Sequence, residues 1–367
     1  MKILLVLPHL KGGGAERITV NLANSLSALG HEVTLLVVKD VGVYFNKISV
    51  SVKTIIVTKC KARLDLYSGI SALYKLTIHA RKSDIVIACL EGWPTILCYI
   101  ASRLSRKPCV GWVHTSLMSH AYNSWGKSQI KILKSIYSKL NAVVCVSHGS
   151  LESFREFVGS DHSRTMQKVI YNSNAYPIVS APKCSNSETP IVLSVGRLYI
   201  KQKGFDLLLE AHKRLIDKKI LHKLIILGDG PDKVTLKAMI NSLGLSNSVE
   251  LHGFQDNIVD WYDNSHVFAL ASRYEGFGLV IVEALARGIP VVTTDCDGPR
   301  EILSSGEYGI IVDKENVESL AKGIELALTN NTLRDRNSTL GLARAQDFNT
   351  DTIVKNWDLF LKEVLNV

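Results

Sequence analysis

Residues 272–286 read SRYEGFGLVIVEALA, and this stretch decides the fold. It follows a short apolar run at 267–270, which is typical of a buried strand. Gly276 and Gly278 interrupt the chain, and the apolar residues beyond them have the spacing of a helix that faces a core. The stretch therefore predicts a strand, a glycine-rich loop and a helix that begins near Gly278.

The beginning of this helix is a predicted anion site. The first turn of a helix presents unpaired backbone N–H groups, and an anion can approach them closely where side chains are missing. The groups concerned belong to Gly276, Phe277, Gly278 and Leu279. Glu275 precedes this turn and Glu283 follows about two turns later. Because carboxylates accept hydrogen bonds from hydroxyls while amides hold phosphate, the combination suits a nucleotide sugar.

Glu275-x7-Glu283 within EGFGLVIVEALARGIPVV resembles the signature of the retaining glycosyltransferases of family 4, of the kind that builds bacterial surface glycans. The wider chain is similar to that family over nearly its whole length. The resemblance implies a nucleoside diphosphate sugar between two Rossmann-like domains, with Glu275 at the donor sugar and Glu283 at the ribose. A Glu-x7-Glu pair without these glycines and apolar neighbours would equally suit a solvated helix face.

The length of 367 residues favours two domains. Strands are expected at 2–7, 32–38, 54–57, 84–88, 108–113 and 142–146, then at 191–198, 223–230, 249–254, 266–272 and 290–294. Helices are expected after Gly14 and at about 65–81, 93–104, 127–139, 204–217, 232–243, 257–262, 278–287 and 352–365. Alternation of this kind predicts parallel sheets and an α/β fold class.

The expected domains are 1–175 for the acceptor, a linker at 176–190 that is rich in Asn, Ser and Pro, and 191–345 for the nucleotide-sugar donor. The resemblance selects the GT-B architecture, with two domains facing across a cleft. It also implies that residues 346–367 form a helix that packs back on the first domain. The NSNA turn at 172–175 departs from the family's usual N-G-V-D or N-P-V-D, which leaves the role of that turn open.

Arg197 and Lys203 are predicted to bind the donor phosphates. Both lie at the carboxyl edge of the second sheet and could converge on a diphosphate, although either alone could be a solvated loop cation. The family's G-R-x(n)-K-G pattern assigns Gly196, Arg197 and Lys203 to those phosphates. Phe254, by resemblance, lies beside the nucleobase. Most of the family uses UDP-sugars, so a UDP-sugar is expected, with GDP and ADP open.

In the first half of the chain, Glu91 and His114-Thr115-Ser116 follow expected strands. Ligands of parallel sheets bind at the carboxyl ends of strands, so these residues are candidates for a site. His114 matches the family's histidine near the donor sugar, although a lone histidine at a strand end is usually structural. Gly13 and Gly14 match the family's loop beside the donor phosphates and the acceptor; a tight turn alone would also explain them. No histidine cluster calls for a metal, and neither a metal nor a cofactor is expected.

The net charge of +9 is unevenly distributed. Residues 1–178 carry 22 Lys and Arg against 9 Asp and Glu, whereas residues 179–367 carry 21 against 25. No nucleic-acid motif accompanies the basic half, so an anionic membrane surface or a lipid-phosphate acceptor fits better. Helix 127–140 is amphipathic, and could lie at the membrane interface or pack on its own domain.

The seven cysteines are scattered, which suits reduced thiols in a cytoplasmic protein. No apolar run is long enough for a membrane span. We therefore expect a cytoplasmic protein, held on the inner membrane face by its basic half. The resemblance implies that it transfers a hexose or N-acetylhexosamine with retention to a lipid-linked or polysaccharide acceptor. A nucleotide-sugar 2-epimerase and a non-catalytic membrane scaffold remain as alternatives.

Overall fold

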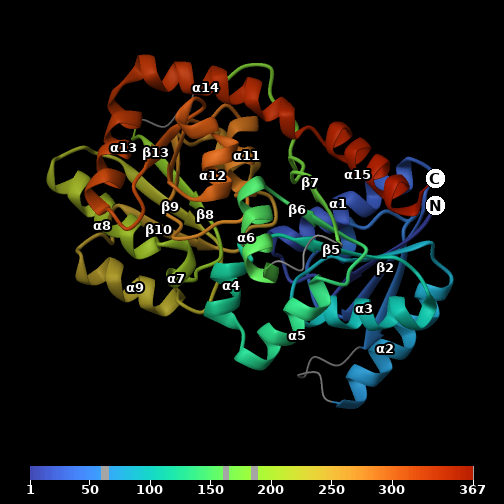
Figure 1. Cartoon of the computed structure of the whole chain (residues 1–367). Coiled ribbons are helices and arrows are strands. Elements are labelled where there is room, and N and C mark those ends of the chain that lie inside the picture. Colours follow the sequence, from blue (N-terminus) through green and yellow to red (C-terminus); the bar gives the residue numbers. More distant parts are fainter. Residues whose placement is uncertain (59–65, 160–164, 183–188, 367) are drawn as a thin grey trace. The chain divides into compact units, whose positions relative to one another are not determined.

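The computed structural model describes residues 1–58, 66–159, 165–182 and 189–366. The chain forms two compact units, of which unit 1 comprises Met1–Ser173 with Thr350–Val367, and unit 2 comprises Asn174–Asn349. Each unit is built on its own sheet, and every strand pair in both sheets is parallel (Figure 1). These Rossmann-like units confirm the predicted α/β fold class.

The sheet of unit 1 has the order β3-β2-β1-β4-β5-β6-β7. Its strands are β1 (Lys2–Leu7), β2 (Glu32–Lys39), β3 (Lys53–Thr58), β4 (Ile85–Ala88), β5 (Cys109–Val113), β6 (Ala142–Cys145) and β7 (Met166–Val169). The central strands β1, β4, β5 and β6 are almost wholly buried. Their sequences are nearly continuous apolar runs, such as KILLVL, because helices cover both faces of the sheet and bury both sides of each central strand.

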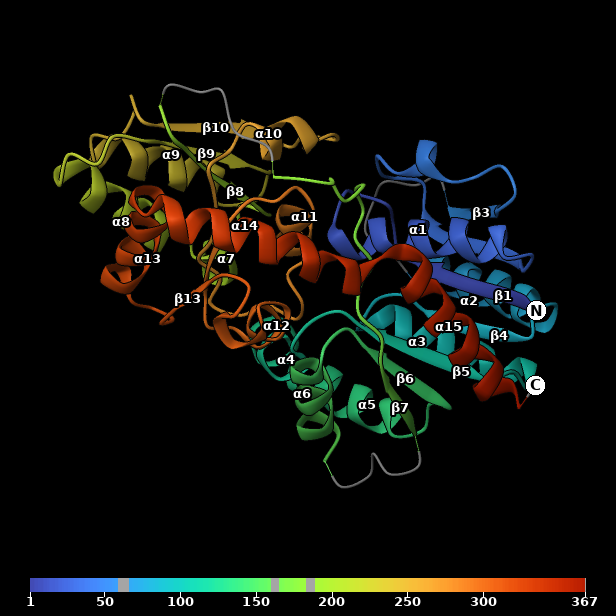
Figure 2. The ribbon, with the colours of Figure 1, turned by 90° about the horizontal axis from the view of Figure 1, so that it is seen from above.

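The helices of unit 1 are α1 (Gly14–Ala28), α2 (Leu66–Arg81), α3 (Trp93–Ser105), α4 (Leu117–Ser124), α5 (Lys127–Tyr137), α6 (His148–Val158) and α15 (Thr350–Leu365). Side chains of α2, α3, α5 and α6 share one core cluster with the sheet. Helix α15 packs beside α1 (Figure 2). Its Trp357 meets Trp112 of β5, with ring centroids 4.7 Å apart. The C-terminal helix therefore completes the core of unit 1.

The sheet of unit 2 has the order β10-β9-β8-β11-β12-β13. Its strands are β8 (Ile191–Val195), β9 (Lys223–Leu227), β10 (Val249–Gly253), β11 (Val267–Leu270), β12 (Val291–Thr294) and β13 (Ile310–Val312). Its helices are α7 (Ile200–Lys203), α8 (Phe205–Asp217), α9 (Lys233–Ser242), α10 (Val259–Asp263), α11 (Leu279–Ala286), α12 (Asp297–Ile302), α13 (Val317–Thr329) and α14 (Asn331–Ala345). Helices α8, α9 and α13 share one core cluster with the sheet, and α14 packs along α11 (Figure 2).

The described part of the expected linker belongs to unit 2. The Val179 N–H donates to the carbonyl of Ala286, and Arg287 donates to the carbonyl of Pro177. The division between the units falls earlier, at Ser173, and the chain returns to unit 1 at Thr350 rather than at 346. Residues 171–182 are thus irregular, as their low periodicity indicated, but hydrogen bonds at Pro177 and Val179 tie this stretch to the end of α11.

Some elements were not expected from the sequence, among them β7, β13, α4, α6, α7, α13 and α14. Strand β7 reads MQKV and its residues are only partly buried or exposed, so it lacks the apolar run of a central strand. Helix α7 is a single turn. Elements as short as α7, or at a sheet edge like β7, are specified by their neighbours more than by their own pattern. This reason does not apply to the longer helices α6, α13 and α14.

Helix α5 packs on its own domain. Its apolar residues Leu133, Ile136 and Tyr137 lie in the unit 1 core, while Lys127 and Lys131 are exposed. Lys134 lies over the ring of Phe157, 5.4 Å from its centroid. Of the two interpretations of this amphipathic helix, packing on the domain is therefore the one observed.

The five described cysteines are Cys89, Cys98, Cys109, Cys145 and Cys296. All are free and buried, as expected of reduced core thiols, and burial raises the pKa of the Cys89 thiol to about 12. Cys60 and Cys184 lie outside the described residues. No helix in the described ranges has the length and apolar character to cross a bilayer.

Candidate functional site

The loop that carries Glu275 connects β11 to α11. Gly278 caps α11 with φ 100°, a left-handed conformation that favours glycine, and no side chain caps the helix. Across the loop lies Gly298 of α12: a Cβ there would lie 2.5 Å from the Cα and the carbonyl oxygen of Phe277. The two glycines therefore allow the loop to pack tightly against α12. The first backbone N–H groups of α11 lie at the end of this loop.

Glu275 and Lys203 meet in unit 2. The Lys203 ammonium lies 2.5 Å from Glu275 Oε2, and the Ser272 hydroxyl donates to the same oxygen over 3.3 Å. Both charged side chains are mostly buried, with 13% and 14% of their surface exposed. The structure thus brings together two predicted site residues that are 72 positions apart in the sequence.

Gly196 lies under the stem of Lys203. A Cβ on Gly196 would lie 3.5 Å from Cδ and Cε of Lys203, an ordinary contact distance, so the lysine stem passes close over the end of β8. Gly204, at φ 61°, leaves no room for any side chain, because a Cβ would overlap the carbonyl oxygen of Ala271. Arg197 is exposed beside this turn. The phosphate-binding residues expected from the sequence therefore share one strand edge.

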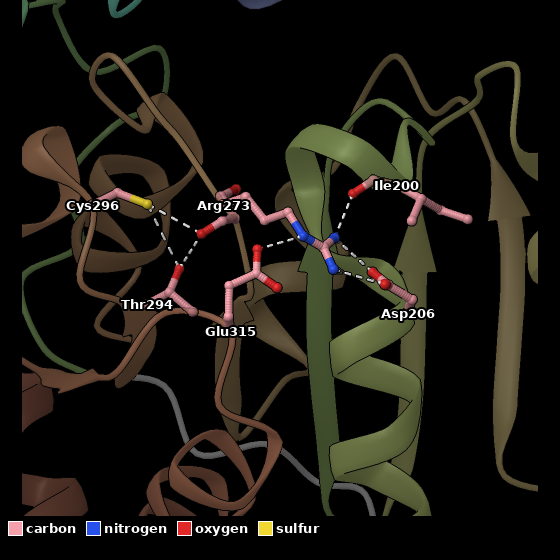
Figure 3. Close-up of polar contacts among 7 residues, drawn as sticks. Ile200, Asp206, Arg273, Thr294, Cys296 and Glu315 are labelled. Carbon is pink, nitrogen blue, oxygen red and sulfur yellow. Dashed lines mark hydrogen bonds and ion pairs between the residues drawn. The ribbon is translucent and has the colours of Figure 1, made fainter. Parts of the chain in front are cut away.

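Arg273 links this lysine turn to the Glu275 loop, and it was not expected from the sequence. Its guanidinium forms two parallel hydrogen bonds of 2.8 Å with Asp206, one of 2.7 Å with Glu315, and one with the carbonyl of Ile200 (Figure 3). Burial would raise the pKa of the Asp206 carboxyl, but the hydrogen bonds and charge of Arg273 outweigh burial and lower it. The Asp206 carboxyl is therefore ionised at neutral pH.

Glu283 lies on α11 with 0% of its surface exposed. Its Oε2 accepts a hydrogen bond of 3.1 Å from the hydroxyl of Tyr262, which is also buried. Tyr262 belongs to α10, so this bond ties α10 to α11. Of the two glutamates in the signature, only Glu275 lies at a partly accessible position.

The remaining residues of the predicted donor site differ in what they present. Phe277 and Leu279 point their side chains into the protein, and Phe277 packs on Phe348 with ring centroids 5.6 Å apart. Only their backbone groups are available to a ligand. Phe254 follows β10 and exposes 42% of its surface, so its ring is open to stacking.

In unit 1, Glu91 and His114 meet at the carboxyl ends of β4 and β5. Glu91 Oε1 accepts the backbone N–H of His114 at 2.5 Å and that of Thr115 at 3.0 Å. The Thr115 hydroxyl lies 3.3 Å from the same oxygen. The buried Glu91 thus fixes the backbone of the strand end that carries His114.

The ring of His114 packs on Trp112, with centroids 4.5 Å apart. Among the described residues, neither ring nitrogen makes a hydrogen bond of good geometry. Burial lowers the pKa of His114, although Glu91, Glu16 and the carbonyl of Cys89 act in the opposite direction. A neutral imidazole with unused nitrogens can donate or accept a ligand hydrogen bond.

Gly13 and Gly14 begin α1, and Glu16 folds back against them. A Cβ on Gly13 would overlap the Glu16 carboxylate, so glycine is required for this arrangement. His9, just beyond β1, lies with Nδ1 3.2 Å from Glu16 Oε1. Sequence reasoning missed His9 and Glu16; their position at the carboxyl end of the first strand was the available signal.

Asn174, in the unusual NSNA turn, has a structural role. Its side-chain amide donates to the carbonyl of Tyr176, and its oxygen accepts the Tyr176 N–H.

In the ranges that the structure describes, no group of three or more histidine, cysteine, aspartate or glutamate side chains could hold a metal ion.

The whole chain is similar to solved GT-B enzymes. It matches the structure of Anabaena HepE in complex with UDP and glucose with a TM-score of 0.83, over 99% of this chain and 100% of that chain, at 22% identity. Two parallel-sheet Rossmann-like units of this kind define a GT-B glycosyltransferase fold.

Two family profiles cover the two units. The profile described as "Glycosyltransferase Family 4" matches residues 12–173, and that described as "Glycosyl transferases group 1" matches residues 179–341. The chain therefore belongs to the family 4 glycosyltransferases, as the signature predicted, and it is an enzyme.

Curated relatives carry more specific names. The chain is 28% identical, over 97% of its length and 98% of the relative, to the N-acetylgalactosamine-N,N'-diacetylbacillosaminyl-diphospho-undecaprenol 4-alpha-N-acetylgalactosaminyltransferase of Campylobacter jejuni. It is 31% identical, over 55% of its length and 58% of the relative, to the lipopolysaccharide core biosynthesis glycosyltransferase LpsE of Rhizobium meliloti.

Proposed function

We propose that this enzyme transfers a hexose or N-acetylhexosamine from a UDP-sugar, with retention, to a lipid-linked or polysaccharide acceptor in surface-glycan synthesis. The observation that carries the proposal is the Lys203–Glu275 pair beside the beginning of α11. It combines a cation, a carboxylate and the backbone N–H groups at the beginning of a helix, which are the groups that a diphosphate joined to a sugar requires.

Cleavage of the bond between the sugar and the diphosphate leaves negative charge on the leaving phosphate. Lys203, Arg197 and the amides of 276–279 would stabilise that charge, and such preorganised groups usually supply the largest share of catalysis. Glu275 would hold sugar hydroxyls and His114 the outer edge of the sugar. Gly13 and Gly14 would let the phosphates or the acceptor approach α1, and Phe254 would border the base.

The expected ribose contact of Glu283 needs a change in its surroundings. Its carboxylate is fully buried and bonded by Tyr262, so a ribose hydroxyl could reach it only if these side chains shifted. The relatives support the donor and acceptor classes through their names: HepE is described with UDP and glucose, and the Campylobacter enzyme acts on a diphospho-undecaprenol glycan.

A thermal-shift screen of UDP, GDP, ADP and their sugars tests the donor. We expect a UDP-sugar to raise the melting temperature and to be transferred or slowly hydrolysed. Glu275→Ala and Lys203→Ala should each lower turnover by about 10² or more. Lys218→Ala removes an exposed cation just after α8 that pairs with Glu325, and should leave turnover unchanged. Absence of binding and activity with the whole panel would refute the proposal, and release of a free epimer in product NMR would favour an epimerase.

We also propose that the basic face of unit 1 attaches the cytoplasmic enzyme to the anionic inner face of the membrane. No acidic residue occurs between Glu91 and Glu152, and Arg103, Lys127 and Lys131 are exposed on α3 and α5. The apolar side of α5 is buried in the domain, so attraction would come from charge, at about 1 kcal/mol for each cation.

Liposome co-sedimentation tests this attachment. Binding should require anionic lipid, fall as salt concentration rises, and weaken when Lys127 and Lys131 are both changed to Glu. The matched control changes Lys213 of α8 and Lys218, which follows this helix, to Glu, and so alters the charge equally in unit 2. Equal binding to neutral vesicles, or none to anionic ones, would leave a soluble acceptor as the better interpretation.

A further inference from the structure

We propose that Arg273 is a positioning residue for donor binding, which with Asp206 holds the Lys203 ammonium at the Glu275 carboxylate. The inference rests on the proposed function, because it takes Lys203 and Glu275 as the residues that bind the donor. Neither the family signature nor the names of the relatives assigns Arg273 or Asp206 a role.

The first observation is how fully Arg273 is engaged. Nη1 donates to Ile200 O and Asp206 Oδ1, Nη2 donates to Asp206 Oδ2, and Nε donates to Glu315 Oε1, all within 2.8 Å (Figure 3). Four of the five N–H groups of a guanidinium are thus used. A side chain fixed in this way cannot move without breaking several charged hydrogen bonds.

The second observation is where these partners lie in the chain. Ile200 is three residues before Lys203, and Asp206 is three residues after it. The backbone N–H of Arg273 also donates to the carbonyl of Gln202 over 2.8 Å. Arg273 itself is two residues before Glu275. One residue therefore joins the lysine turn on both sides of Lys203 to the loop that carries the carboxylate.

The third observation is that the backbone beside Arg273 is fixed from the opposite side. The carbonyl of Ser272 accepts hydrogen bonds from Thr294 at 2.5 Å and from the Cys296 thiol at 3.1 Å (Figure 3). Ala271 is in close contact with Gly204. Movement of the Glu275 loop toward or away from Lys203 is consequently resisted at three successive residues.

The chemistry requires arginine. The guanidinium plane matches the two oxygens of Asp206, whereas lysine offers a single ammonium that cannot bind both oxygens in parallel. The two side chains are partly shielded, with 22% and 23% exposed, so water weakens the pair less than it weakens a surface pair. Asp206 also lies in the first turn of α8, where a carboxylate is favoured.

A purely structural role would make Arg273 important for stability alone. Positioning makes a different prediction, because the value of Lys203 to a diphosphate should then depend on Arg273. A double-mutant cycle measures this dependence. Lys203→Met suits the cycle, since it removes the ammonium and keeps a stem that can pass over Gly196.

We would measure the Kd of uridine diphosphate by calorimetry for the wild type, Lys203→Met, Arg273→Lys and the double variant. Lys203→Met should weaken binding about 10-fold in the wild type and less than about 3-fold beside Arg273→Lys. Arg214→Gln is the matched control. It removes an exposed ion pair between Arg214 of α8, the helix that carries Asp206, and Glu318 of α13, and should leave the effect of Lys203→Met at about 10-fold.

An equal effect of Lys203→Met in both backgrounds would overturn the positioning role while leaving the proposed donor intact. If Arg273→Lys does not fold, Asp206→Asn gives the same cycle, since it keeps an acceptor and loses the charge. A wild type that binds no uridine diphosphate would instead refute the proposed donor, and this role with it.

Discussion

At Gly298 the Glu275 loop and helix α12 approach each other so closely that a side chain cannot be accommodated. The atoms that a Cβ would meet are backbone atoms of Phe277, which cannot turn aside as the end of a flexible side chain could. The sequence showed a G-P-x-E-I loop here without indicating what it touches. The close contact at Gly298 supports the backbone of the loop that leads into the first turn of α11.

We therefore expect Gly298→Ala to displace the loop and lower stability by about 1–3 kcal/mol, as overpacking commonly does. Urea unfolding measures the stability, and binding of uridine diphosphate should weaken in the folded fraction. The control is Gly69→Ala in α2, where a Cβ would have nothing within 4 Å. A Gly298→Ala protein as stable and as competent in binding as the control would show that the loop yields without cost.

At the scale of elements, a chain of buried hydrogen bonds connects α8 with the turns before β9 and β10. His222 Nδ1 donates to Ile220 O, so its Nε2 accepts from Nδ1 of His212, which lies 2.8 Å away. His212 Nε2 can then accept from the Ser248 hydroxyl at 2.9 Å. The bond between the two rings requires at least one neutral imidazole, because two protonated rings would bring two N–H donors together.

Unit 2 should therefore lose stability in mild acid. Burial, followed by the neighbouring His222, lowers the pKa of His212 to about 3, and burial lowers that of His222. The unfolded chain binds protons near its ordinary pKa of 6.5 while the folded chain does not. Stability is thus complete above pH 6.5 and falls below it, by about 2 kcal/mol at pH 5 from His212 alone.

Urea unfolding between pH 8 and pH 5 checks this expectation. His212→Gln cannot titrate in this range, so its stability should depend less on pH than that of the wild type. Near pH 8 the stability of both proteins should change little with pH. Parallel curves for the two proteins down to pH 5 would exclude His212 as the source.

At the scale of the whole molecule, the chain leaves unit 1 at Ser173, forms unit 2 and returns at Thr350. The last helix is a part of the unit 1 core. Trp357 is fully buried against Trp112, and the ring of Trp112 also packs on His114. On the same helix, Asp358 lies 2.8 Å from His31. The C-terminus thus supports the strand end that carries the predicted sugar-binding histidine.

Trp357→Ala should destabilise unit 1 by about 3–5 kcal/mol, the usual cost of removing a large core aromatic side chain. Tryptophan fluorescence during urea unfolding reports mainly on unit 1, because four of the five tryptophans lie there. Leu359→Ala, on the same helix with 64% of its surface exposed, should change stability by less than about 0.5 kcal/mol. Similar losses in the two variants would mean that α15 packs only loosely.

The sequence by itself determined most strands and many helices of this protein, although not the helices α6, α13 and α14. Strands such as 2–7 and 267–270, the helix that begins after Gly278, and the final helix follow from apolar periodicity and glycine positions, which act within a few residues. The motif also marked Glu275 and Lys203. The edge strand β7 and the one-turn helix α7 escaped prediction because their patterns are too short to stand apart from loops.

Tertiary structure decided which groups meet and which are accessible. Arg273 and Asp206 are 67 residues apart, and nothing in the local pattern of either predicts their pairing. The same holds for Glu283, which resembles Glu275 in the signature yet is buried behind Tyr262, and for α5, whose apolar side faces its own core. Contacts of this kind depend on how the sheet brings distant strand ends to one edge, and this information belongs to the fold as a whole.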